Sequence, residues 1–424
     1  MARQKAWHKL DNTANLFPVI AGRRTANVFR MTAVMHKEVV PEYLQQALEE
    51  TLPAFAAFSV RLRHGLFWSY LEQNDAPVHI AQETQAPCRY IDPLETGRYL
   101  FRVLYFGKRI SLETFHVLTD GTGAMRFLKA ICYRYCQLCD AQAFEAQTRD
   151  IPYGIEQGKN VLDGYLKNYT PKAQKQSFKE PRAFRVRGEP RLSFDLGVST
   201  LLFPVQEIKT LCHQYDASVS EYLTAALLMA VYEEYMPVSG SKRPVSVFVP
   251  VDLRRIFETD TSSNFFSGFS VRYRFSGTKP EFTDVLKQVQ EQFREKCTKE
   301  MFEKKLAYTA KSALSVWTRV IPLVVKNGVL RVIYEASNHA STLTLSNFGP
   351  IQVEPLFEPY FEGFRFLLSS TRQEPLKCSA VAYQDTVALT VCSELLGNDL
   401  ARNLARRLSG QGVAVQVECA EGEV

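Results

Sequence analysis

A strand, a sharp turn and a helix follow one another early in the chain, and this succession most constrains its fold. Apolar and polar residues alternate from Lys108 to His116, which is typical of a half-buried strand. The alternation breaks at Asp120-Gly121, and apolar residues then recur at helical spacing, which predicts a helix from Thr122 to about Cys139. The pattern therefore places one imidazole, that of His116, at the end of a strand. Taken alone, such a pattern is more often a tight turn with a histidine nearby by chance.

The chain has 424 residues, which exceeds what one hydrophobic core usually fills, so two domains are expected. We predict an N-terminal domain over residues 1–166, a basic linker over 167–191 and a C-terminal domain over 192–424. The longest apolar stretch, Leu314 to Tyr334, is interrupted by charged residues and a proline, so no transmembrane segment is predicted. No apolar segment of a secretory signal follows the first basic residues, and nine cysteines show no disulfide-like spacing. Together these features favour a cytoplasmic protein.

The net charge of +6 is concentrated in one segment. Residues 159–191 hold nine Lys or Arg against three Asp or Glu, a surplus that equals the charge of the whole chain. A nucleic-acid-binding protein would normally carry its basic patch on a folded motif. Here the basic residues fall in a polar tract that contains proline, which favours a solvated linker and gives no reason to expect a nucleic-acid partner.

Two further stretches place polar residues at the ends of strands. The apolar run Val245–Val251 is typical of a central strand covered on both faces, and Asp252 and Arg254 follow it directly. A desolvated aspartate needs a partner, and a bidentate arginine is the best one available. Further on, the strand ending in Ser346-Asn347-Phe348-Gly349-Pro350 is expected to stop in a Gly-Pro turn. Each stretch alone is compatible with an ordinary strand end or turn.

The remaining pattern predicts an α+β organisation in both halves, with strands, helices and further strands at similar sizes. In the second half, a Ser218–Glu221 capping box is expected to begin a buried helix. The other second-half elements expected from their periodicity are a strand at Phe265–Phe275, a long helix at Glu281–Glu303, strands at Gln352–Pro355, Phe364–Ser369, Cys378–Tyr383 and Val387–Cys392, a helix at Leu396–Leu408 and a strand at Val413–Val417.

Taken together and in this order, the three motifs resemble those of the CoA-dependent acyltransferase superfamily, whose fold is that of chloramphenicol acetyltransferase. The corresponding residues are His116, Asp120 and Gly121, then Asp252 and Arg254, then Ser346, Asn347, Gly349 and Pro350. The likeness extends to Leu10-Asp11-Asn12 and to Phe265-Phe266-Ser267-Gly268, so it covers most of the chain. It is strongest to the alcohol acetyltransferase and polyketide-associated acyltransferase branch.

Two departures set the chain apart from other branches. Peptide condensation domains and wax-ester synthases usually carry two adjacent histidines, whereas Phe115 precedes His116 here. Plant acyltransferases of this fold carry Asp-Phe-Gly-Trp-Gly where this chain has Ser-Asn-Phe-Gly-Pro.

The resemblance implies a fold of two α/β sandwich-like domains (α+β type) with mixed or antiparallel sheets and a channel between them. It implies that His116 is the general base in a direct transfer without an acyl-enzyme. Asp120 would turn away from the substrate and pair with an arginine, here Arg254, while Gly121 permits the turn. Ser346 or Asn347 could donate to the oxyanion, although their turn could equally be architectural. Asp252, Gly349 and Pro350 would be structural.

The resemblance also implies the ligands. The donor would be acyl-CoA, by default acetyl-CoA, with an acyl carrier protein as a possible alternative, and the acceptor a small alcohol or amine. No permanently bound cofactor or metal ion is implied. Four basic residues are candidate contacts for the donor's phosphates, although a solvated helix face is the simpler interpretation of each: Lys304, Lys305, Lys326 and Arg331.

Two other hypotheses stay open. The first is a catalytically silent member of the same fold that binds a ligand or a carrier protein. The second rests on Cys132, Cys136 and Cys139, which have the Cys-x3-Cys-x2-Cys spacing of radical S-adenosylmethionine enzymes. These cysteines fall inside the predicted helix, and the chain lacks the regular β/α alternation of a barrel. Buried cysteines that pack as small hydrophobic residues are the better explanation.

Overall fold

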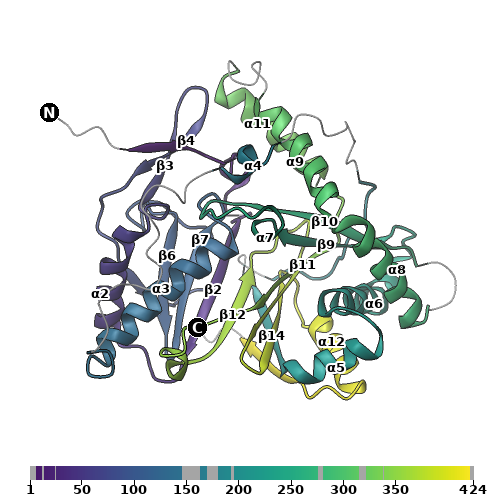
Figure 1. Cartoon of the computed structure of the whole chain (residues 1–424). Coiled ribbons are helices and arrows are strands. Elements are labelled where there is room, and N and C mark those ends of the chain that lie inside the picture. The colour runs from purple at the N-terminus through teal and green to yellow at the C-terminus, as the bar shows by residue number, and fades with distance from the viewer. Residues whose placement is uncertain are drawn as a thin grey trace.

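Two sheets of different size form the cores of two lobes that stand side by side (Figure 1). The computed structural model describes residues 6–11, 14–23, 25–145, 163–169, 180–191, 195–275, 280–314, 321–337 and 339–420. Each lobe has its own cluster of buried apolar side chains. The predicted fold class is confirmed: both lobes combine helices with mixed, mainly antiparallel sheets.

The first lobe is built on a five-stranded sheet of order β12-β2-β7-β6-β5. Its strands are β2 (Val28–Met35), β5 (Ile80–Gln82), β6 (Phe101–Phe106), β7 (Arg109–Phe115) and β12 (Phe361–Leu368). Helices α2 (Pro41–Thr51) and α3 (Gly121–Cys139) pack on one another and α3 on β2. A small sheet of β1 (Trp7–Lys9), β4 (Ser69–Gln73) and β3 (Val60–His64) and the short helix α1 (Phe17–Ile20) complete this lobe.

The second lobe is built on a seven-stranded sheet of order β10-β9-β11-β13-β14-β8-β15. Its strands are β8 (Gly197–Pro204), β9 (Val245–Asp252), β10 (Phe266–Tyr273), β11 (Leu343–Pro350), β13 (Leu376–Tyr383), β14 (Thr386–Ser393) and β15 (Gln416–Ala420). Its helices are α4 (Gly164–Lys167), α5 (Val205–Gln214), α6 (Val219–Ser239), α7 (Arg254–Phe257), α8 (Phe282–Lys296), α9 (Lys299–Leu314), α11 (Leu323–Ser337) and α12 (Asp399–Gly410).

Local sequence signals set where the main helices begin. Asp120 is the N-cap of α3, and its carboxylate accepts the backbone N–H of Gly123 at 3.3 Å. The capping box of α6 is present as predicted, with Ser218 and Glu221 exchanging hydrogen bonds.

The second half of the chain contributes one strand to the first lobe. Strand β12 comes late in the chain, within the range that we assigned to the C-terminal domain, yet it pairs antiparallel with β2 of the first sheet. The register runs from Phe361 opposite Met35 to Leu368 opposite Phe29. The first lobe therefore holds residues from both ends of the sequence.

Part of the predicted linker packs on the second lobe instead of being solvated. Phe184 and Val186 are buried, and the Phe184 backbone N–H donates to Pro244 O at 2.7 Å. Residues 170–179 of this linker lie outside the described residues.

Four element predictions were wrong in detail. The expected long helix is two helices, because α8 ends before Cys297 and α9 begins at Lys299. Residues 352–355 form no strand, since their backbone joins a loop that leads to a short 3₁₀ helix at Glu358–Tyr360. Strand β9 lies next to the edge strand β10 instead of at the centre. The last strand begins at Gln416, three residues later than expected.

Candidate active site

His116 lies just beyond the C-terminal end of β7, where the sequence pattern placed it. Its backbone N–H donates to Asn27 O at 2.9 Å, which ties the turn to the neighbouring strand. The imidazole stacks on Phe17 of α1 with ring centroids 4.6 Å apart, and Phe29 and Phe266 contact it from other sides. Residues from both lobes therefore hold the ring in one orientation.

The amide of Asn264 determines which nitrogen of His116 carries the proton. His116 Nδ1 lies 3.0 Å from Asn264 Oδ1. The amide nitrogen of Asn264 donates to Asp11 Oδ2 at 3.0 Å and to His116 O at 3.1 Å, and both of these atoms are acceptors. Because the NH₂ group must face these acceptors, Oδ1 faces the ring and accepts a proton from Nδ1. The lone pair is then on Nε2, for which no described residue is a hydrogen-bond partner.

Burial shifts the pKa values of His116 and Asp11, which are linked by hydrogen bonds through Asn264. Desolvation lowers the pKa of His116, and the nearby Asp120 carboxylate opposes this shift in part. Desolvation also raises the pKa of Asp11 to about 7, against the hydrogen bonds from Asn264 and the Ala14 backbone. A neutral imidazole with a free Nε2 is the form that can accept a proton.

Asp120 and Arg254 form the expected buried pair across the lobes. Arg254 Nη1 lies 2.9 Å from Asp120 Oδ2 and Nη2 lies 3.0 Å from Oδ1, a bidentate arrangement. Both side chains are more than nine-tenths buried. Asp120 also accepts the Phe265 backbone N–H, and the Arg254 guanidinium donates to Thr261 O and Ser263 O. Both carboxylate oxygens of Asp120 are therefore engaged by protein partners.

Asp252 links the same arginine to the first lobe. Its Oδ1 accepts the backbone N–H and Nη1 of Arg254, each at 3.0 Å. Its Oδ2 accepts the hydroxyl of Thr122 on α3 at 2.9 Å. This matches the structural role expected for Asp252.

Gly123, rather than Gly121, is the glycine that the turn requires. Gly121 is the first residue of α3 and has no positive φ. A Cβ on Gly121 would meet the flexible Met31 Cε at 3.0 Å, whereas a Cβ on Gly123 would lie 2.0 Å from Thr119 Oγ1 and 2.7 Å from Ser262 O. The close approach of two lobes at Gly123 leaves no room for a side chain, so the expectation that Gly121 permits the turn was wrong.

The Ser346–Pro350 motif lies within strand β11, not in a turn that ends it. The register shifts between Asn347 and Gly349, a β-bulge, and Gly349 has a φ of 80°, which favours glycine. A bulge offsets the strand without ending it, and Pro350 is its last residue.

The two oxyanion candidates point to opposite faces of β11. Ser346 pairs in register with Ser379, whose hydroxyl donates to Phe366 O of β12, so this face looks towards the first lobe. Asn347 points the other way, where its Nδ2 donates to Ser220 Oγ on α6 at 3.0 Å and its Oδ1 accepts the Gly349 N–H. Of the two, only Ser346 therefore lies on the face nearer to His116.

The three spaced cysteines lie on α3. Cys132 and Cys136 are buried, Cys139 is exposed, and burial raises the pKa of all three thiols. Within the described ranges no group of three or more His, Cys, Asp or Glu side chains could hold a metal ion. The described helices also include none that is long and apolar enough to cross a bilayer.

Two cavities are described, and His116 lines neither. The larger, of about 320 Å³, lies between the lobes: Ala26 and Tyr90 line it from one side and Leu196 and Glu394 from the other. Ala26 precedes Asn27, so this cavity begins next to the strand that holds the His116 backbone.

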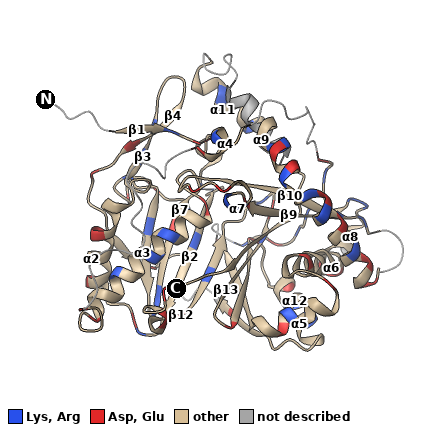
Figure 2. Ribbon diagram, in the orientation of Figure 1, with Lys and Arg blue, Asp and Glu red and all other residues tan. Residues whose placement is uncertain are grey.

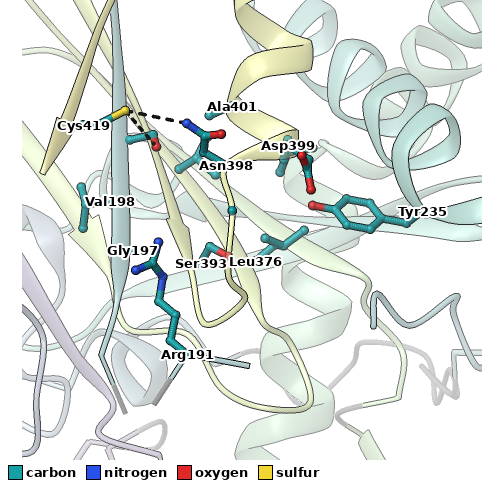
Figure 3. A pocket seen from close by; sticks show the side chains of 14 residues that line it. Arg191, Gly197, Val198, Tyr235, Leu376, Ser393, Asn398, Asp399, Ala401 and Cys419 are labelled. Carbon is teal, nitrogen blue, oxygen red and sulfur yellow. Dashed lines mark hydrogen bonds between the residues drawn. The ribbon is translucent and has the colours of Figure 1, made fainter. Parts of the chain in front are cut away.

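The smaller cavity, of about 140 Å³, belongs to the second lobe (Figure 3). Tyr235 and Asp399 point toward one another at one end of it, and Asn398 lies beside Cys419 at another. None of the predicted site residues lines it.

The basic residues proposed as phosphate contacts are largely engaged with the protein itself. Lys305 donates to Gly268 O, Lys326 donates to Phe67 O at 2.8 Å, and Lys304 pairs with Glu300 at 2.8 Å. The structure therefore does not gather them around a common site.

Sequence reasoning gave no role to Phe17 and Asn264, which contact the imidazole, or to Asp11, which accepts a hydrogen bond from Asn264. Asn264 follows Arg254 in a polar loop with no distinguishing pattern. The only available signal was that Asp11 and Phe265 belong to stretches that resemble the superfamily.

Comparisons with known proteins rest on structure, since no family model and no curated protein sequence matches this chain. Polyketide synthase associated protein 5 from Mycobacterium tuberculosis is 13% identical, with a TM-score of 0.61 over 95% of this chain and 96% of that one. The first condensation domain of the calcium-dependent antibiotic synthetase, in complex with a substrate analogue, is 13% identical, with a TM-score of 0.63 and 96% coverage of both chains.

A third similar structure is TRI101 of F. sporotrichioides complexed with coenzyme A and T-2. It is 9% identical, with a TM-score of 0.60 over 97% of this chain and 99% of that one. All three align over nearly their full lengths at low identity, so the likeness is one of fold. The protein thus shares the two-lobed fold of these three structures.

Proposed function

We propose that this protein is an acyltransferase that moves an acyl group, by default acetyl, from a CoA thioester to a small alcohol or amine. The observation that carries the proposal is the hydrogen bond between His116 Nδ1 and Asn264 Oδ1, which leaves the Nε2 lone pair free to accept a proton. The fold supports it, because TRI101, which has this fold, was solved with coenzyme A.

In the proposed reaction, His116 Nε2 removes the proton from the acceptor O–H or N–H as that atom attacks the thioester carbonyl. The carbon–oxygen π electrons move onto oxygen, and Ser346 is our candidate donor to this oxyanion. When the intermediate collapses, the carbon–sulfur bond breaks and the thiolate takes the proton from the imidazolium. No acyl-enzyme forms, and no permanently bound cofactor takes part. Positioned proton transfer of this kind contributes about 10²–10⁴-fold in rate.

Asp120, Arg254 and Asp252 would act through the backbone. They join α3 of the first lobe to the segment after β9 in the second, and so hold the turn that carries His116. We assign them a positioning part in the reaction, because their hydrogen bonds are to one another and to Thr122.

A carrier-protein thioester is the alternative donor. The similarity to a protein described as polyketide synthase associated supports keeping it as a candidate. Both donors present the same thioester carbonyl, so the proposed role of His116 does not depend on which one is used.

Release of free thiol from acyl-CoA and acyl-carrier-protein donors, with panels of alcohols and amines, tests the proposal. Wild type is expected to turn over at least one pair, and His116→Ala to lose about 10²–10⁴-fold in kcat/KM with an unchanged melting temperature. Equal activity of the two proteins would contradict the role of His116. A wild type that binds a donor but is inert across the panels would favour the silent ligand-binding member instead.

A further inference from the structure

An exposed apolar surface runs along α11 and onto the tip of the β3–β4 hairpin. On α11 it comprises Val324, Val325, Val329 and Val332, with relative exposures of 84%, 55%, 55% and 67%. On the hairpin it comprises Leu66, exposed at 72%, and Trp68, exposed at 44%. We call these six residues the α11–hairpin surface.

The two parts of this surface are joined by direct contacts. The Leu323 backbone N–H donates to Leu66 O at 2.8 Å, and Lys326 Nζ donates to Phe67 O at 2.8 Å. In Figure 1 both parts lie together at one extremity of the molecule, where they protrude from the body of the lobes. The two parts therefore lie together where the molecule protrudes.

The charged residues around it are mainly basic. Among the described side chains of α11, the charged ones are Lys326 and Arg331, both basic (Figure 2). On the hairpin side, Lys9 lies over the Trp68 ring at 5.8 Å, and Arg63 is also at the surface. The acidic residue there, Glu72, is already paired with Arg61 and Arg63.

We propose that the α11–hairpin surface docks on an anionic lipid bilayer. A helix that exposes a stripe of valines beside basic residues has the pattern of an element that lies in the membrane interface. Tryptophan side chains also favour the membrane interface, and each nearby Lys or Arg adds electrostatic attraction to anionic headgroups. A protruding apolar surface suits a deformable lipid layer, whereas a protein partner would need a matching groove.

The location of the surface connects it to the candidate active site. Helix α11 packs against α1, and α1 carries Phe17, which stacks on the His116 imidazole. Docking through α11 would therefore bring the side of the site closed by Phe17 towards the bilayer. The proposal itself rests on the surface residues and not on the acyltransferase function.

Vesicle flotation with the full-length chain tests the proposal. The probes are phosphatidylcholine vesicles with and without phosphatidylglycerol. Wild type is expected to float with the anionic vesicles and more weakly with the neutral ones. Val329→Asp and Val332→Asp together should lower the partition coefficient by about tenfold or more, since they remove two apolar side chains from the contact. Arg331→Glu should lower it by about fivefold or more on anionic vesicles only.

Matched controls keep the test specific. Leu94→Asp changes a side chain that is 84% exposed but lies elsewhere on the first lobe. Lys287→Glu changes an exposed, positively charged residue on α8. Both should bind as wild type does, and circular dichroism should show that every variant is folded. A wild type that does not float, or surface variants that float as wild type does, would overturn the proposal. So would light scattering that reveals a dimer dispersed by the valine substitutions, because the surface would then be an interface between two copies.

Discussion

Arg254 donates hydrogen bonds to both carboxylate oxygens of Asp120, at 2.9 and 3.0 Å, although the two residues are 134 positions apart in the sequence. The pair joins the two lobes next to the turn that carries His116. Removing Arg254 leaves the Asp120 carboxylate buried without a charged partner, and removing Asp120 leaves Arg254 with Asp252 as its remaining ion-pair partner. Losing one member of a buried pair is more costly than losing the pair as a whole.

The first prediction follows from that asymmetry. Asp120→Ala and Arg254→Ala should each lower the free energy of unfolding by about 3–5 kcal/mol. Arg126→Ala is the matched control, because Arg126 also bridges the lobes, to Asp260 at 2.7 Å, but Asp260 is 67% exposed. That substitution should cost less than about 1 kcal/mol. Urea unfolding measures the free energy of unfolding of all three variants. If Arg126→Ala lowers it as much as Asp120→Ala and Arg254→Ala do, the Asp120–Arg254 pair contributes no more to stability than an exposed ion pair between the lobes.

The second prediction concerns the tautomer of His116. Asn264→Ala removes the acceptor for Nδ1–H, so the ring can adopt the tautomer whose Nε2 carries the proton and cannot act as a base. We expect kcat/KM to fall by about tenfold or more, since a wrong tautomer alone can greatly reduce general-base catalysis. Asn347→Ala removes a partly buried amide that donates to Ser220 in the second lobe, and it should leave this rate nearly unchanged. If the two variants lose equal activity, Asn264 does not act through the imidazole.

The third prediction is the pH dependence of the reaction. Burial lowers the pKa of His116 from its ordinary value of 6.5, so the neutral base persists to lower pH than a solvated histidine would allow. The acidic limb of kcat/KM, where Nε2 becomes protonated, should therefore be centred below 6.5. Initial rates at saturating donor and varied acceptor, in buffers of constant ionic strength, give this profile. An acidic limb centred above 6.5 would contradict the assignment.

The fourth prediction separates two neighbouring glycines. A Cβ on Gly123 would overlap Thr119 and the Ser262 carbonyl, whereas a Cβ on Gly121 would be tight only against the flexible end of Met31 and would lie at ordinary contact distance from the Phe348 ring. Gly123→Ala should therefore lower the free energy of unfolding by about 1–3 kcal/mol or more, and Gly121→Ala by much less. Thermal or urea unfolding compares them, and greater sensitivity at Gly121 would restore that residue as the one the turn requires.

The local parts of the site could be predicted from the sequence because short-range patterns encode them. The alternation before His116 and the helical period after Asp120 need no knowledge of the rest of the chain. The pairing of Asp120 with Arg254 was implied by the resemblance to the superfamily and not by any local pattern.

The sequence could not show which residues surround the imidazole. Asn264 meets His116 from 148 positions away, and Asp11 meets Asn264 from 253. Such contacts depend on the packing of two lobes. The sequence around a polar loop residue does not indicate which distant residue it contacts.

Strand pairing was likewise decided by tertiary structure. The amino acids of β12 indicate a strand but not its partner, and β12 joins the first sheet because hydrogen bonding to β2 covers that sheet's edge. For Ser346 and Asn347, a strand alternates its faces, so one position of register decides which residue looks towards the first lobe. The sequence alone thus determined the turn that presents His116, while packing between the lobes decided what orients its ring and which side chains share its space.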